Sequence, residues 1–232
     1  LSSSPEDVLA GLRDAFVLRD ASDIFRVQHL DAFRRLLRLI AGQVGDLVNV
    51  AEWAAICGVS RPTVDAYIDL LDETHLVRRV RPFAGGKRAE LTHDPKVYFC
   101  DNGLRSAVLG RYEPFDQSPE RGALLESWVA AELIKHLDPL APTDELRYWR
   151  TKAGAEVDFV LHRPDGLVGV EVKASEHARP KLSRSTRSFL DAYQPKRLLV
   201  VTLGTTAEET IGPTHVNWIG PESLASALFG SA

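Results

Sequence analysis

The sequence predicts an α/β protein in two parts, an N-terminal winged helix followed by a mixed α/β domain. A long helix, a short helix and a capped helix follow one another before residue 75, an order typical of a helix-turn-helix. Two strand patterns then flank a glycine-rich turn, as in a wing. From residue 120 onward, helical patterns alternate with apolar strands, which indicates a mixed sheet covered by helices on both faces.

Residues 1–21 are interpreted as a helical connector. Ser4 is a suitable N-cap, Pro5 suits the first turn, and two acids follow at the positive end of the helix. We expect this helix to extend to Leu18. The chain begins Leu-Ser-Ser-Ser and contains no methionine, so we expect a fragment that this helix joins to a domain upstream.

Residues 22–115 carry the winged-helix pattern. The predicted helices are 31–41, 51–57 and 61–74, and the predicted strands are 76–82 and 97–100. The inward face of the first helix consists of Phe33, Leu36, Leu37 and Ile40. Gly58 ends the short helix, and Ser60 caps the helix that follows.

The third predicted helix argues against tight binding of duplex DNA. Its exposed positions include acids that would repel phosphates, namely Asp65, Asp69, Asp72 and Glu73. A scaffold or protein-contact role is therefore the alternative to DNA binding. The wing is basic, and its cations either hold phosphates or are simply solvated: Arg78, Arg79, Arg81, Lys87 and Arg88.

A linker is predicted at residues 112–119, which contain two prolines and several polar residues. The second domain then covers residues 116–232. Its predicted helices are 120–137, 180–193 and 221–228, and its predicted strands are 147–150, 156–161, 167–173, 197–203 and 216–219.

Two of these strands bring charged residues to one surface. Strands 156–161 and 167–173 flank a Pro-Asp-Gly turn, in which Pro sets φ and Gly accepts a positive value. Because strand side chains alternate between faces, Glu171 and Lys173 share one face. If the hairpin pairs across this turn, Asp158 meets them on a largely apolar sheet. Charges there cost free energy unless they are paired or bind metal.

An Asp, a Glu and a Lys in this arrangement are what metal-dependent phosphodiester cleavage needs. Asp158 and Glu171 offer hard oxygen ligands to Mg²⁺ or Mn²⁺, which would lower the pKa of a bound water. Lys173 would stabilise developing charge or orient that water. Glu126, on the edge of the buried face of helix 120–137, is the predicted third metal ligand. The alternative is an edge hairpin whose charges merely face solvent.

The pattern Asp…Glu-x-Lys across a hairpin, preceded by a helical Glu, resembles the PD-(D/E)xK, or restriction-endonuclease-like, fold. Between residues 16 and 203 the chain more closely resembles the C-terminal region, a domain of unknown function, of bacterial and archaeal AAA-type ATPases. In that family a winged helix precedes the nuclease-like domain. The matching segments are 18–20, 96–104, 122–126 and 148–173. The resemblance implies that Glu126, Asp158, Glu171 and Lys173 occupy catalytic-type positions.

Composition narrows the function classes. The 232 residues are 44% hydrophobic and 26% charged with a net charge of −4, which is ordinary for a globular protein and not broadly basic. No apolar run approaches the ~20 residues of a membrane span, and no signal peptide is visible. Cys57 and Cys100 lack metal-ligand spacing, so a reducing cytoplasm is expected. The chain has no GxxxxGK[ST] loop, so ATP is expected only in the upstream domain.

Three functions remain open. The first is Mg²⁺- or Mn²⁺-dependent hydrolysis of nucleic acid, with Lys181, Arg184 and Arg187 either contacting phosphate beside the site or simply solvated. The second is a catalytically silent module that binds nucleic acid or a protein partner and regulates the ATPase. The third is an oligomerisation domain. The complete set of acids with Lys173 favours the first function, and the modest basicity favours the others.

Overall fold

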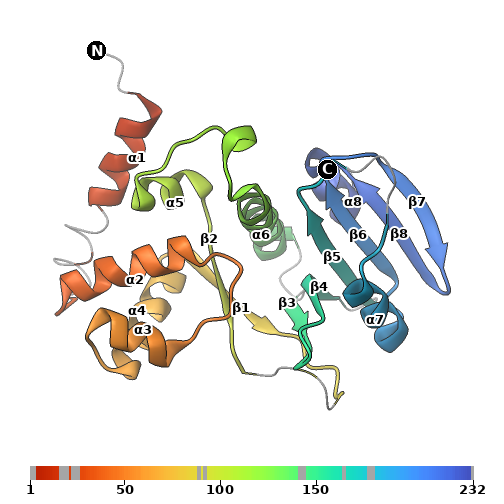
Figure 1. Ribbon diagram of the computed structural model, residues 1–232, viewed down its shortest axis with the longest axis horizontal. Coiled ribbons are helices and arrows are strands. Elements are labelled where there is room, and N and C mark those ends of the chain that lie inside the picture. The colour runs from red at the N-terminus through yellow and green to blue at the C-terminus, as the bar shows by residue number, and fades with distance from the viewer. Residues whose placement is uncertain are drawn as a thin grey trace. The chain divides into compact units, whose positions relative to one another are not determined.

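The computed structural model describes residues 4–15, 21, 27–87, 90, 93–140, 145–163, 166–176 and 181–230. It divides into two compact units, one made of residues 1–79 and 96–119 and the other of residues 80–95 and 120–232. Figure 1 traces the helices and strands of each. N-terminal helices are followed by an eight-stranded mixed sheet with interspersed helices, which confirms the predicted α/β class.

The first unit begins with helices. Its described elements are α1 (Pro5–Asp14), α2 (Leu30–Gly42), α3 (Val50–Cys57), α4 (Arg61–Glu73), β1 (Val77–Pro82), which continues into the second unit, β2 (Lys96–Phe99), α5 (Asn102–Leu109) and the short 3-10 helix η2 (Phe115–Gln117). The three helices and two strands predicted between residues 31 and 100 are confirmed to within one residue at each end. The predicted extension of α1 to Leu18 lies outside the described residues.

Local caps explain where these helices begin and end. The Ser4 side chain accepts the N–H of Asp7, and the Asp7 carboxylate accepts the N–H of Ser4, each at 3.2 Å. The Ser60 hydroxyl accepts the N–H of Thr63 at 3.3 Å, as predicted. Gly58 ends α3 in the left-handed region with φ 71°, where a side chain would be strained.

Helix α5 was not predicted from the sequence, because its apolar pattern is interrupted by polar residues. Asp101 caps it by accepting the N–H of Leu104 at 2.7 Å. Arg105 is only 3% exposed, and its Nε donates to the carbonyl of Ala41 at the end of α2, at 2.8 Å. The guanidinium of a buried arginine needs a hydrogen-bond acceptor, and here α2 supplies the carbonyl. Because that partner comes from another helix, α5 cannot be recognised from its own periodicity.

The core of the first unit lies between its helices and the beginning of its strands. Every residue predicted on the inward face of α2 is buried, and Phe33 meets the ring of Tyr67 edge-on at 5.3 Å. Further buried members from α3, α4 and the strands are Trp53, Val64, Ile68, Leu71, Val77 and Phe99. Apolar burial is therefore what holds these elements together.

The acids of α4 are partly neutralised within the first unit. Asp69 lies 2.9 Å from Nη2 of Arg79, and Asp72 lies 3.6 Å from Nε of Arg78. Each pair joins α4 to β1, so two of the predicted wing cations face carboxylates of the same unit. Such pairs make α4 less repulsive to phosphate and make β1 less attractive to it. Arg88, another predicted wing cation, lies outside the described residues.

The second unit holds most of the sheet. Its elements are α6 (Arg121–Leu140), β3 (Glu145–Arg150), β4 (Glu156–Arg163), β5 (Gly166–Lys173), α7 (Arg184–Tyr193), β6 (Arg197–Thr202), β7 (Ala207–Ile211), β8 (Thr214–Ile219), η3 (Pro221–Ser223) and α8 (Leu224–Phe229). All the predicted elements are present. Helix α7 begins later than residue 180, because Ser183 is its N-cap. Strand β7 was missed, because it is mostly exposed and carries two glutamates.

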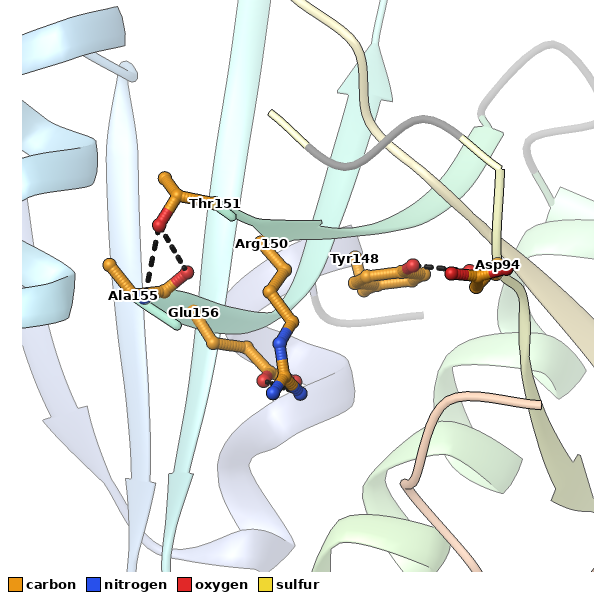
Figure 2. Close-up of polar contacts among 6 residues, drawn as sticks. All are labelled: Asp94, Tyr148, Arg150, Thr151, Ala155 and Glu156. Atoms are coloured by element: carbon orange, nitrogen blue, oxygen red, sulfur yellow. Dashed lines mark hydrogen bonds and ion pairs between the residues drawn. The ribbon is translucent and has the colours of Figure 1, made fainter. Parts of the chain in front are cut away.

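The strand order is β2-β1-β3-β4-β5-β6-β8-β7. Neighbours β3–β4, β4–β5 and β8–β7 are antiparallel, whereas β1–β3, β5–β6 and β6–β8 are parallel. Helix α6 packs against β3 and β5, and α7 packs against β4. The Tyr148 hydroxyl donates to the carbonyl of Asp94, which ties β3 to the segment after β1 (Figure 2). In the described part of the chain, no helix is both long and apolar enough to cross a membrane.

Candidate functional site

Strands β4 and β5 form the predicted antiparallel hairpin, and Asp158 lies where their pairing ends. Backbone pairing runs from the turn up to Phe159↔Val170. Beyond that pair, the N–H of Val172 donates to Oδ2 of Asp158 at 2.7 Å. Because a buried N–H needs an acceptor, the carboxylate takes the place of a backbone carbonyl. The Asp158 carboxylate is therefore held against the backbone of β5 at Val172, the residue that follows Glu171.

Glu171 is buried on the face of the sheet that α7 covers. A Cβ added at Gly169 would lie 3.1 Å from the ring of Phe189 in α7, so alternation places Glu171 and Lys173 on that same face. The Glu171 residue is 4% exposed, while the Lys173 side chain is 47% exposed. Lys173 Nζ lies 2.6 Å from Oε1 of Glu171. The other oxygen, Oε2, is buried and has no hydrogen-bond partner among the described residues.

Electrostatic interactions connect Glu171 to the other predicted residues. Burial raises the pKa of Glu171, attraction to Lys173 partly offsets that rise, and repulsion from Glu156 and Glu126 adds to it. Burial lowers the pKa of Lys173, but attraction to Glu171, Asp158 and Glu126 outweighs it, so this pKa is raised overall. Lys173 is therefore a fixed positive charge at neutral pH, and the three predicted acids all lie close enough to influence it.

Glu126 reaches this neighbourhood from α6. An ion pair of 2.9 Å between Arg121 and Glu176 ties the start of α6 to the segment just after β5. Glu126 is partly exposed and follows the buried Leu125, as predicted for the edge of the apolar face. Glu126 on α6 is thus close enough to act on the pKa of Lys173 at the end of β5.

Glu156 is a charged neighbour that the sequence reasoning missed. Residues 151–155 form a tight turn from β3 to β4, in which the N–H of Ala155 donates to the Thr151 hydroxyl at 3.0 Å. The turn sets Arg150 opposite Glu156, with Nη1 and Oε2 2.9 Å apart (Figure 2). Arg150 is therefore paired with Glu156. The available signal was the position of Glu156 two residues before Asp158 on one strand.

The predicted metal ligands are not gathered into one cluster. Among the residues that the structure describes, no group of three or more His, Cys, Asp or Glu could hold a metal ion as it stands. Asp158 and Glu171 still offer suitable chemistry, because they are hard oxygen donors on adjacent strands and Glu171 Oε2 has no described partner. Two such acids suit Mg²⁺ or Mn²⁺, which keep several waters and take further ligands from phosphate. Glu126 is present as a nearby charge.

Two domain families match this chain. Residues 3–114 match DUF8612 and residues 121–219 match DUF4143, each described as a domain of unknown function. DUF4143 is known in AAA-ATPase-associated proteins. The DUF4143 match includes α6 and the β4–β5 hairpin, and therefore all four of the predicted site residues.

Curated relatives resemble most of the chain. Uncharacterized proteins of Mycobacterium tuberculosis and Mycobacterium bovis are each 30% identical over 196 residues, which is 84% of this chain and 43% of the relative. An uncharacterized protein of Haemophilus influenzae is 24% identical over 176 residues, 72% of this chain and 40% of that protein. The chain thus spans less than half the length of these relatives.

Proposed function

We propose that the second unit is a metal-dependent phosphodiesterase that acts on nucleic acid, in the C-terminal part of an AAA-type ATPase. The observation that carries the proposal is the end of the β4–β5 ladder. There the Asp158 carboxylate is anchored on a backbone N–H beside a buried Glu171, which pairs with Lys173 through Oε1 and has no described partner for Oε2. The order α6, β3, β4, β5, α7, β6 supports a restriction-endonuclease-like fold for this unit.

The first unit is a winged helix in this proposal, supported by the order α2, α3, α4, β1, β2. It would connect the nuclease-like unit to an ATPase domain that the longer relatives have room for. ATP would bind in that domain and not in this chain. Nucleic acid is the proposed substrate, and the ATPase domain is the proposed partner.

Each site residue has a role that follows from its position. Asp158 and Glu171 would hold Mg²⁺ or Mn²⁺, with Glu126 as the third acid nearby. When bound, such an ion polarises a phosphate oxygen and lowers the pKa of a coordinated water. Lys173 is protonated and half exposed, so it can meet an approaching phosphate and offset charge that develops on it. The hydrogen bond from Val172 orients Asp158 before substrate arrives.

The test is divalent-dependent cleavage of labelled single- and double-stranded DNA and RNA, with EDTA as the blank. Lys173→Ala should reduce cleavage by about 10²–10³-fold, because it removes one preorganised charge. Lys135→Ala is the matched control, since Lys135 is an exposed lysine on α6 that pairs with Glu132. Equal cleavage by the wild type and Lys173→Ala would mean that the activity comes from another site or from a contaminant.

A catalytically silent module that regulates the ATPase is the second candidate. It is favoured by the lack of a ready-made three-acid group among the described residues. Such a module would bind nucleic acid, a protein partner or a second copy of the chain. The ATPase-containing protein would then show no cleavage under any of these conditions, while its ATPase rate would respond to the added nucleic acid or partner.

A further inference from the structure

A basic pocket opens beside the proposed site. It has a volume of about 450 Å³ and receives cations from two elements: Lys173 from the end of β5, and Lys181, Arg184 and Arg187 from the start of α7 and the residues before it. The three cations near α7 are exposed. Lys173 therefore belongs both to the pocket and to the proposed site.

The sheet register shows that the pocket and the proposed site share one face. Strand β6 pairs with β5 in parallel, which places Val200 beside Glu171 and Thr202 beside Lys173. Val200 and Thr202 both line the pocket. In-register neighbours on parallel strands point to the same side, so the floor of the pocket continues directly from Glu171 and Lys173.

The charged residues among the described lining of the pocket are all positive. None of the described lining residues is Asp or Glu, and no described carboxylate forms an ion pair with Lys181, Arg184 or Arg187. Ser183, the N-cap of α7, also lines the pocket, so the positive end of that helix faces the same space. Several uncompensated cations around a hollow select an anion.

Size and lining indicate what kind of anion fits. A hollow of about 450 Å³ is in the range of small-molecule sites and suits one nucleotide better than a duplex. The apolar lining residues are Leu182, Val200 and Trp218, while the four lining Ser and Thr residues and the cations are polar. A phosphate would lie among the cations, and a sugar or base would lie against the apolar lining residues.

We propose that this pocket is a phosphate-binding subsite that holds one nucleotide of a single nucleic-acid strand, next to the phosphate that is cleaved. The inference rests on the proposed function, because Lys173 belongs to both sites. It would lie between the phosphate held in the pocket and the phosphate that is cleaved. Its ligand is a phosphate group, which a strand supplies either at its end as a monoester or within the backbone as a diester. The phosphate in the pocket would be held by Lys181, Arg184 and Arg187. These cations would therefore determine which strands the site can position for cleavage.

The test measures binding without cleavage. The 232-residue chain is titrated in EDTA against single-stranded DNA and RNA oligonucleotides, followed by fluorescence anisotropy at several salt concentrations. Arg184→Ala/Arg187→Ala should reduce the slope of log affinity against log salt by about 1.4, from two lost contacts at roughly 0.7 each. Arg184→Lys/Arg187→Lys retains the charges and should bind nearly as the wild type does. Lys135→Ala, outside the pocket, should leave both affinity and slope unchanged.

The oligonucleotides distinguish the sources of phosphate. Strands with a 5′-phosphate, a 3′-phosphate or only hydroxyl ends are compared, and tighter binding of one phosphorylated end identifies a monoester. Equal binding of all three identifies a backbone diester. No binding by the wild type, binding unchanged in the Ala variant, or equal loss in the Lys variant would overturn the subsite. Equal competition by duplex would overturn its assignment to a single strand.

The two proposals can fail separately. Salt-sensitive binding that depends on Arg184 and Arg187, without cleavage in Mg²⁺ or Mn²⁺, would support the subsite and overturn hydrolysis. Cleavage that depends on Lys173, with strand binding unaffected by Arg184→Ala/Arg187→Ala, would support hydrolysis and overturn the subsite.

Discussion

Asp158→Ala is expected to weaken the second unit and to abolish metal binding, because one carboxylate serves both the backbone and the site. Oδ2 of Asp158 accepts the N–H of Val172 at 2.7 Å, a charge-assisted hydrogen bond. Its loss leaves that part-buried N–H without its acceptor, which lowers the free energy of unfolding by about 1–3 kcal/mol. Asp158→Asn keeps an acceptor oxygen, so it should lose less than about 1 kcal/mol while still losing the charge that a metal requires.

Three measurements test this reasoning. Urea unfolding in EDTA gives the stability change, amide hydrogen exchange reports on the N–H of Val172, and calorimetric titration with Mn²⁺ reports on the metal. Asp191→Ala is the control, because Asp191 is exposed on α7, and it should stay within about 0.5 kcal/mol of the wild type. Asp158→Ala with wild-type stability and wild-type exchange at Val172 would refute the dual role.

Gly169→Ala should lose about 1–3 kcal/mol of stability, because its new Cβ would lie 2.9 Å from Leu198, whereas Gly122→Ala has no atom within 4 Å to meet. Thermal unfolding compares the two, and equal midpoints would contradict the packing argument. Lys173→Ala removes a charge that lowers the pKa of Glu171, so that pKa should rise further and Mn²⁺ should dissociate at a higher pH than from the wild type. An unchanged pH midpoint of Mn²⁺ binding in Lys173→Ala would contradict the predicted rise in the pKa of Glu171. The first unit should bind random duplex DNA weakly, because α4 is acidic and two arginines of β1 pair with it. Sub-micromolar affinity with a steep salt slope in a titration would show that this surface was misjudged.

Local structure was largely predictable from the sequence. The apolar spacing of α2, the caps at Ser4 and Ser60, and the alternation in β4 and β5 depend on residues a few positions apart. Two elements, α5 and β7, were not predicted, and each for a physical reason. Helix α5 contains Arg105, which is stable when buried only because α2 supplies a carbonyl. Strand β7 is exposed and polar, so its pairing with β8 leaves little trace in its hydrophobic pattern.

The candidate site was likewise predicted from the sequence only in part. Strand alternation in the sequence by itself placed Glu171 and Lys173 on one face, because that depends only on a period of two. Only the tertiary structure decided that Asp158 accepts the N–H of Val172, that Arg150 pairs with Glu156, and that cations from α7 line a pocket together with Lys173. These contacts join residues from different strands and helices, so they depend on where a ladder ends and how a helix packs, which no local pattern encodes.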